Sequence, residues 1–126
     1  LEWGMGNSTL YFAERVNDIL SIEHNKEWFD LITIELPKNV TGVLETSDNY
    51  HLYPLKENKR FDLIIVDGIN RKECLNIAPK ILSDNGFIIF DNSERDPYLC
   101  ENLRNENFIE IDFHGFGPIN PYTWTT

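Results

Sequence analysis

The sequence predicts an α/β domain built on a mainly parallel sheet, and three patterns support this. Short apolar runs alternate with segments of helical spacing almost throughout the 126 residues. The run Phe61–Val66 is apolar on both faces, as a buried central strand of a parallel sheet is. A Gly-x-Gly turn, Gly4-Met-Gly6, directly precedes the first helical pattern. Together they predict a doubly wound sheet with helices between its strands.

Composition limits the classes of protein to which the chain can belong. Hydrophobic residues make up 41% and charged residues 25%, as in an ordinary globular domain of one core. The net charge of -10 argues against a nucleic-acid partner, which needs a basic face. Cys74 and Cys100 fall in helical patterns, which favours free thiols and a cytoplasmic setting. No apolar run reaches membrane-spanning length, so no membrane partner is expected, and the oligomeric state is not indicated.

The first strand is short at its beginning, because only Leu1 and Glu2 precede Trp3 and the turn. We therefore expect a single domain over residues 1–126 that lacks a segment before Leu1.

The first half of the chain predicts two helices and two strands. Helical spacing runs from Ser8 to about Val16, where Asn7 or Ser8 can serve as the N-cap. A strand over 19–22 ends at Glu23, and Asn25 is a suitable N-cap for the next helix, which Pro37 stops. That helix has one apolar face made of Trp28, Leu31, Ile32 and Leu36. Residues 40–44 are expected to form a third strand, and residues 46–60 a polar connection without a period.

The second half continues the alternation. After the strand Phe61–Val66, Asn70 and Glu73 suggest a capping pair for a helix. Its buried face is expected to consist of Leu75, Ala78, Ile81 and Leu82. A turn over 83–86 leads to a strand over 87–90, and Asp96 with Pro97 is expected to begin another helix. Residues 108–114 alternate as an antiparallel edge strand does, and Tyr122 and Trp124 suggest a last strand.

Acidic side chains stand where most of the predicted strands end. Because ligands of parallel sheets bind outside the carboxyl ends of the strands, these positions are the candidate site. They are Glu2 before Gly4, Glu23, Glu45, Asp67 and Asp91, of which Glu45 fits an ordinary solvated turn. Gly4 permits a tight turn and Gly6 a close approach of a ligand. Glu23 stands about twenty residues further on, where an acid binds ribose hydroxyls.

These motifs resemble class I S-adenosylmethionine-dependent methyltransferases. The resemblance rests on Glu2-Trp-Gly4-Met-Gly6-Asn-Ser8, on Glu23, and on residues 61–67 and 86–92, and it covers nearly the whole chain. It implies a Rossmann-like fold with an antiparallel strand pair at the C-terminal end, and methyl transfer to a small-molecule acceptor. It also implies S-adenosylmethionine as cofactor, bound by Glu2, Gly4, Gly6, Ser8, Glu23 and Asp67, with Asp67 and Asp91 as catalytic residues. Ser8 stands where the family often has a third glycine.

A narrower resemblance is to metal-dependent small-molecule O-methyltransferases. In these enzymes the positions of Asp67, Asp91 and Asn92 bind a divalent cation, usually Mg²⁺. Here Asn70 stands where that group commonly has a lysine base. We therefore favour a site without metal, in which Arg71 or Arg95 neutralises the two aspartates.

Two other functions remain open. A non-catalytic cofactor-binding or interaction module would keep the fold without a recognisable base. An NAD-dependent dehydrogenase would share the glycine turn and the ribose acid, but gives no standard role to Asp67, Asp91 or the final strand pair.

Overall fold

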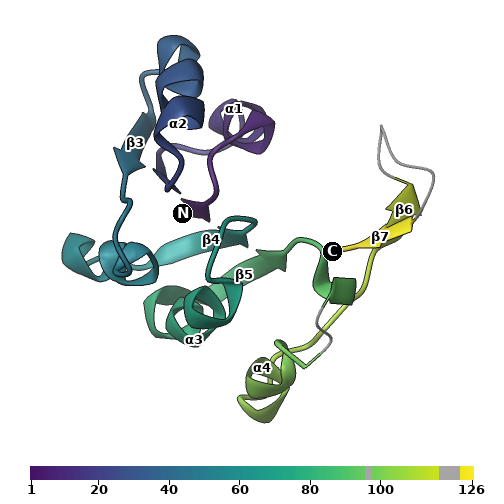
Figure 1. Ribbon diagram of the computed structural model, residues 1–126. Coiled ribbons are helices and arrows are strands. Elements are labelled where there is room, and N and C mark those ends of the chain that lie inside the picture. The colour runs from purple at the N-terminus through teal and green to yellow at the C-terminus, as the bar shows by residue number, and fades with distance from the viewer. Residues whose placement is uncertain (96–97, 117–122) are drawn as a thin grey trace.

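The computed structural model describes residues 1–95, 98–116 and 123–126, which form a five-stranded parallel sheet and a separate antiparallel pair (Figure 1). The order of strands in the large sheet is β3–β2–β1–β4–β5, and every neighbouring pair is parallel. The strands are β1 Glu2–Trp3, β2 Ile19–Glu23, β3 Val40–Leu44, β4 Phe61–Val66 and β5 Leu82–Phe90. The pair consists of β6 His114–Phe116 and β7 Thr123–Thr125. The predicted α/β class, with its parallel sheet and antiparallel pair, is confirmed.

Helices connect the strands. They are α1 Asn7–Ala13, α2 Lys26–Ile32, α3 Arg71–Ile81 and α4 Glu101–Asn105, with 3-10 turns η1 Thr33–Glu35, η2 Tyr50–Glu57 and η3 Ser93–Arg95. Figure 1 shows α1 and α2 beside β1 to β3, and α3 beside β4 and β5. None of the helices in the described ranges is long and apolar enough to cross a membrane.

The core lies on the central strands and on α3. Trp3 of β1, Ile22 of β2 and Val66 of β4 have no exposed surface. From α3, Cys74 and Ala78 are equally buried. The short β1 is held on both sides, because Glu2 pairs in register with Ser21 and with Ile65. The sheet therefore brings its carboxyl ends together around the turn that follows β1.

Several local predictions are confirmed. β2, β3 and β4 lie where the apolar runs placed them. The Asn25 side chain accepts a hydrogen bond from the Trp28 backbone N–H at 3.0 Å, which makes it the N-cap of α2. The expected inner face of α3 is buried, with Leu75 only 2% exposed.

The first two helices differ from the prediction. α1 ends at Ala13 instead of Val16, and its N-cap residue is Gly6 instead of Asn7 or Ser8. The expected apolar face of α2 is not buried, since Leu31 is 62% exposed. The inner face of α2 instead includes Phe29, which together with Leu36 lies against β3: a Cβ at Gly42 would lie 3.5 Å from Phe29 and 3.0 Å from Leu36.

The region around β5 also differs. β5 begins at Leu82 and includes the predicted turn over 83–86, because the ladder to β4 shifts register between Phe61 and Leu63. Asn70 stands at the N-cap of α3 but adopts a left-handed conformation with φ 49°, and its side chain makes no capping hydrogen bond. The predicted capping pair with Glu73 is therefore wrong.

The predicted strand over 108–114 is wrong except at its last residue, His114, because no strand among the described residues pairs with this stretch before β6 meets β7. Ile109 is 90% exposed and Ile111 67% exposed. The predicted helix start at residues 96 and 97 and the predicted strand residue 122 lie outside the described residues, and α4 begins at Glu101.

Candidate functional site

The candidate site lies where β1, β2, β4 and β5 end, and the turn after β1 packs directly on the turn after β4. Gly4 has φ +100°, a conformation that favours glycine, and a Cβ at Gly4 would lie 2.7 Å from the Gly68 backbone nitrogen. Gly6 is different, because a Cβ there would meet nothing closer than the Ser8 hydroxyl at 4.0 Å. Gly4 is thus required by packing, whereas the space beside Gly6 is open.

Glu2 is a buried acid whose hydrogen bonds connect α1 with the sheet. Its carboxylate is 1% exposed and accepts hydrogen bonds from the hydroxyls of Ser8 (2.5 Å), Thr9 and Ser21 (2.7 Å). Burial raises the pKa of Glu2, and the three hydroxyl hydrogen bonds oppose this effect. Glu2 and Ser8, both predicted to contact a cofactor, therefore bind each other in this structure.

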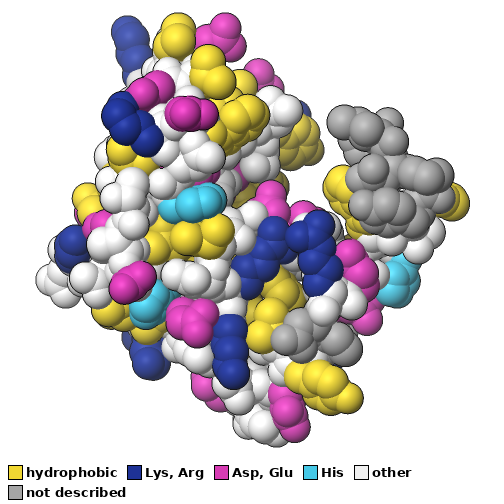
Figure 2. All heavy atoms as spheres, in the orientation of Figure 1, with side chains coloured by type: hydrophobic (Ala, Val, Ile, Leu, Met, Phe, Trp, Pro, Cys, Tyr) yellow, Lys and Arg dark blue, Asp and Glu magenta, His cyan; other side chains and the backbone are white. Residues whose placement is uncertain are grey.

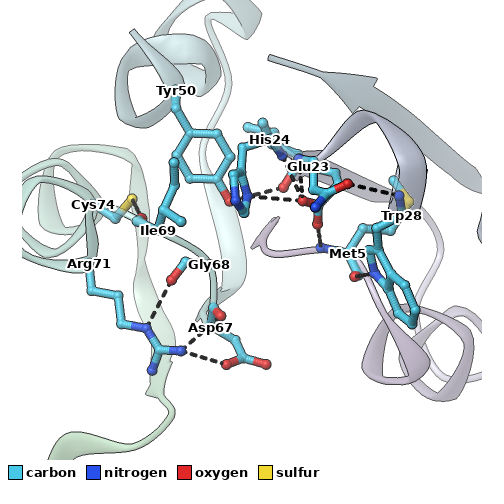
Figure 3. Close-up of polar contacts among 12 residues, drawn as sticks. Met5, Glu23, His24, Trp28, Tyr50, Asp67, Gly68, Ile69, Arg71 and Cys74 are labelled. Atoms are coloured by element: carbon cyan, nitrogen blue, oxygen red, sulfur yellow. Dashed lines mark hydrogen bonds and ion pairs between the residues drawn. The ribbon is translucent and has the colours of Figure 1, made fainter. Parts of the chain in front are cut away.

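Glu23 fixes the glycine turn from the neighbouring strand (Figure 3). Its carboxylate is 4% exposed and accepts backbone N–H groups of Met5 at 3.1 Å, His24 at 2.8 Å and Asn25 at 2.7 Å. The Nδ1 atom of His24 also lies 2.9 Å from Glu23 Oε1, but its direction does not satisfy a hydrogen bond. The role of Glu23 in binding the hydroxyls of a ligand stays a prediction.

The other side of the turn is held by aromatic residues. Trp28 Nε1 donates to the Met5 carbonyl at 2.6 Å, so Met5 is fixed at both its N–H and its C=O. Tyr50 has no exposed surface and donates its hydroxyl to the Ile22 carbonyl at 3.1 Å. A Cβ at Gly68 would lie 2.2 Å from that hydroxyl, so Tyr50 closes the space behind the turn after β4. Nothing in the sequence indicated this role of Tyr50, because the stretch that carries it has no period.

Arg71 joins the ends of β4 and β5. Its guanidinium donates to the Asp67 carboxylate at 3.0 Å and to the carbonyls of Asp67 and Gly68, both at 2.9 Å. It also donates to the Asp91 carbonyl and, at 3.4 Å, to the Asn92 side chain. Figure 2 shows basic side chains with acidic ones directly beside them over this region. Arg71 thus neutralises the carboxylate of Asp67, as expected, but it binds Asp91 only at its backbone carbonyl.

Asp67 and Asp91 form an interacting carboxyl pair. The pKa of Asp67 is raised to about 6, first by burial and then by the charge of Asp91, while Arg71 opposes the shift. The second contact of Asp91 is the Thr126 hydroxyl, which donates to its Oδ1 at 2.8 Å. Asp67 can therefore carry a proton at mildly acidic pH while it remains 41% exposed to solvent.

The structure brings the predicted residues together in separate groups. Glu2 with Ser8 lies under the turn, Glu23 lies beside it, and Asp67, Asp91 and Asn92 meet through Arg71. Within the described ranges, no three acidic, His or Cys side chains form a group suited to a metal ion. The roles predicted for Asp67 and Asp91 in catalysis are not tested by this geometry. Thr126 was missed because its contact with Asp91 joins residues far apart in sequence.

The comparisons with known proteins identify one fold relative. No protein-family profile and no curated protein matches the chain. A solved structure from Methanobacterium thermoautotrophicum, described as precorrin 8W decarboxylase, matches with a TM-score of 0.64 and 24% identity. The match covers 94% of this chain and 68% of that one. At this identity the likeness shows the fold.

This comparison corrects the functional assignment made from the sequence. The matching structure is described as a decarboxylase, and no family match supports a class I methyltransferase. We therefore withdraw methyl transfer, S-adenosylmethionine and the Mg²⁺ option, together with the silent cofactor-binding module and the NAD-dependent dehydrogenase. The physical reason is that two of the acids behind the resemblance, Glu2 and Glu23, are engaged within the fold. Glu2 is engaged by three hydroxyls and Glu23 by three backbone amides.

Proposed function

We propose that this chain carries an enzyme site that decarboxylates a substrate with several carboxylate groups, with Asp67 as the proton donor. The observation that carries the proposal is the Asp67–Asp91 pair, in which the pKa of Asp67 is raised to about 6 just after the carboxyl end of β4. The described function of the matching structure supports the same class of reaction.

Decarboxylation suits a protonated acid held at such a position. The bond between the substrate carbon and its carboxylate breaks, CO₂ leaves, and the electron pair stays on the carbon. That carbon then takes a proton, which the Asp67 carboxyl supplies, and solvent returns the proton to Asp67. A group whose pKa lies near the working pH is best suited to this transfer. Arg71 keeps Asp67 in place through its carboxylate and its carbonyl.

A substrate carboxylate needs a cation that is not already engaged. Arg71 is committed to five oxygen atoms of the turns after β4 and β5. Arg95 lies in η3, just after Asp91 and Asn92, and it is exposed. Among the described residues, no acidic side chain forms an ion pair with its guanidinium. Arg95 is therefore the group that we assign to binding a substrate carboxylate.

The substrate class to test first is a carboxylated tetrapyrrole, because the matching structure is named for a precorrin. Release of CO₂ from such a substrate should be measured with the wild type, with Asp67→Asn and with Asp62→Asn. Asp62 is a matched control, because it is an exposed aspartate near the beginning of the same strand, at the end opposite to the turn.

We expect Asp67→Asn to slow CO₂ release by about 100-fold or more, because loss of a general acid typically has that effect. Asp62→Asn should keep the wild-type rate. Arg95→Gln should raise the substrate KM about tenfold with a smaller effect on kcat. Equal rates for Asp67→Asn and the wild type, or no CO₂ release by the wild type from any carboxylated tetrapyrrole, would remove the proposal.

A further inference from the structure

Tyr50 connects the end of β2 with the turn after β4, the turn that carries Asp67. It is the first residue of η2, and its side chain has no exposed surface. Figure 3 shows its ring reaching from η2 toward Gly68. We propose that Tyr50 is a positioning residue, whose hydroxyl supports Gly68 and thereby places the carboxyl of Asp67. The importance of this placement for proton donation rests on the proposed function.

The Tyr50 hydroxyl is held at a defined place. It donates to the Ile22 carbonyl of β2 at 3.1 Å, and the Tyr50 backbone N–H donates to the Ser47 carbonyl, also at 3.1 Å. The ring packs edge to face on His24, with the ring centroids 6.0 Å apart. It belongs to the same buried core cluster as Cys74 of α3. Because the hydroxyl is bonded and the ring is packed, the hydroxyl oxygen acts as a rigid support.

Gly68 lies directly against this support. A Cβ at Gly68 would lie 2.2 Å from the Tyr50 hydroxyl oxygen and 3.1 Å from Cζ of the same ring. The backbone nitrogen of Gly4 would also lie 3.1 Å from it. Gly68 does not have a positive φ, so glycine is required here by lack of space and not by backbone conformation. The turn after β4 therefore has its place set by Tyr50 and by Gly4.

The position of Gly68 is passed on to Asp67 through the backbone and through Arg71. The guanidinium of Arg71 donates to the Gly68 carbonyl at 2.9 Å, and to the Asp67 carbonyl at 2.9 Å and its carboxylate at 3.0 Å. The Asp67 backbone N–H donates to the Trp3 carbonyl at 2.9 Å. A shift of Gly68 would disturb this set of bonds. A misplacement of about 1 Å at a reacting group is enough to slow a reaction strongly.

Two substitutions and their combination test the support. Tyr50→Phe removes one oxygen, and the Ile22 carbonyl keeps the hydrogen bond from the Gly4 N–H at 2.9 Å, so the variant should fold. Gly68→Ala adds a methyl group that collides with the hydroxyl oxygen. In the double variant that oxygen is absent, and the nearest atoms to the methyl group lie at 3.1 Å. Tyr50→Phe should therefore partly rescue Gly68→Ala.

Tyr53→Phe is the matched control. Tyr53 lies on the same element, η2, and is only partly buried. Its ring lies beside the ammonium of Lys56, with 4.5 Å from that nitrogen to the ring centroid. Removal of its hydroxyl leaves the contact with Gly68 untouched, so any effect common to loss of a tyrosine hydroxyl in η2 is measured by this variant.

The first readout is NMR titration of the Asp67 side-chain carboxyl carbon without substrate. The pKa of Asp67 is raised to about 6 by burial and by Asp91, with a smaller contribution from Glu2, while Arg71 opposes the shift. A displaced turn weakens these surroundings, so the midpoint should move toward the ordinary Asp value of about 4. The dissociation constant of the Asp67 proton should rise about threefold or more in Tyr50→Phe and about tenfold or more in Gly68→Ala.

The control and the double variant complete this measurement. Tyr53→Phe should titrate as the wild type does. The double variant Tyr50→Phe/Gly68→Ala should titrate closer to the wild type than Gly68→Ala alone.

The second readout is CO₂ release from a carboxylated tetrapyrrole. Tyr50→Phe should lower kcat about threefold and Gly68→Ala about tenfold, with partial recovery in the double variant. Because Tyr50 is fully buried and cannot contact the substrate, KM for Tyr50→Phe should stay within about twofold of the wild-type value.

The two readouts separate failure of this inference from failure of the proposed function. An Asp67 midpoint unchanged in Tyr50→Phe and Gly68→Ala, an equal shift in Tyr53→Phe, or a double variant no better than Gly68→Ala would overturn the positioning role of Tyr50. The predicted NMR pattern without CO₂ release by the wild type would remove the decarboxylase function, and would still support the placement of Asp67 by Tyr50.

Discussion

Glu2, the first residue of β1, and Glu23, the last residue of β2, lie on neighbouring strands, and each is surrounded by donors of a different kind. Glu2 accepts three side-chain hydroxyls, from Ser8, Thr9 and Ser21. Glu23 accepts three backbone N–H groups. In both cases the acid organises the turn that follows β1. Asp67 differs from both, because it is partly exposed and its neighbour Asp91 is another acid.

Removing the buried acid should destabilise the domain strongly. Glu2→Ala should lower the free energy of unfolding by about 2–4 kcal/mol, because it leaves hydroxyls of buried Thr9 and Ser21 without their acceptor. Ser8→Ala removes one of the three bonds from a half-buried position and should cost about 1 kcal/mol. Urea unfolding of both variants measures the two values, and a loss below about 1 kcal/mol for Glu2→Ala would contradict this role of the carboxylate.

The raised pKa of Asp67 predicts a pH-dependent contribution to stability. The folded protein holds this proton more tightly than the unfolded chain, in which an Asp titrates at about 4. The contribution is therefore fully present below about pH 4 and is lost as the pH rises through about 6. Because the side chain is 41% exposed, screening reduces its size to on the order of 1 kcal/mol.

Asp67→Asn is the reference for that measurement, since it does not titrate at this position. The stability of the wild type relative to the variant should fall between pH 4 and pH 7, as measured by urea unfolding at each pH. A difference that stays constant over this range would show that the pKa of Asp67 is not raised.

At the scale of elements, the contact between the turn after β1 and the turn after β4 sets the geometry of the site. Gly4 meets Gly68 backbone to backbone, and Tyr50 fills the space behind Gly68. Because backbone atoms cannot move aside as a flexible side chain can, this contact has little tolerance for added atoms.

Two alanine substitutions in this turn should behave differently. Gly4→Ala combines a φ of +100° with a 2.7 Å contact to backbone, and should destabilise the domain by about 3 kcal/mol or more. Gly6→Ala should change the free energy of unfolding by less than about 1 kcal/mol, because φ is -172° and the nearest atom lies 4.0 Å away. Thermal or urea unfolding distinguishes them, and similar losses for both variants would contradict the packing described.

The elements also show what could be predicted from the sequence and why. β2, β3, β4 and the N-cap at Asn25 follow from local patterns of a few residues, and all are confirmed. The segment 108–114 has a strand pattern, but over most of its length no strand in the described parts of the chain lies next to it, because pairing depends on segments distant in sequence.

The candidate site was only partly predictable for the same reason. The acids at the strand ends were identified, but their partners were not, since Glu23 finds its donors in Met5 and in the start of α2. The resemblance to methyltransferases rested largely on a glycine turn and on Glu2 and Glu23, which this fold engages internally. A fold of this kind carries many different functions, so the motif predicted the architecture better than the reaction.

At the scale of the whole molecule, the strand order explains how distant residues form one site. β1 lies at the centre of the sheet, so the turn after it is flanked by the ends of β2 and β4. β5 follows β4, which places Asp91 beside Asp67 although the two are far apart in sequence.

The most direct test of the proposed function is the pH dependence of kcat for CO₂ release from a carboxylated tetrapyrrole. If the protonated Asp67 is the donor, kcat should fall about tenfold per pH unit above a pKa of about 6, and this limb should vanish in the residual activity of Asp67→Asn. A kcat that stays constant or rises between pH 6 and pH 8 would contradict proton donation by Asp67 and with it the proposed mechanism.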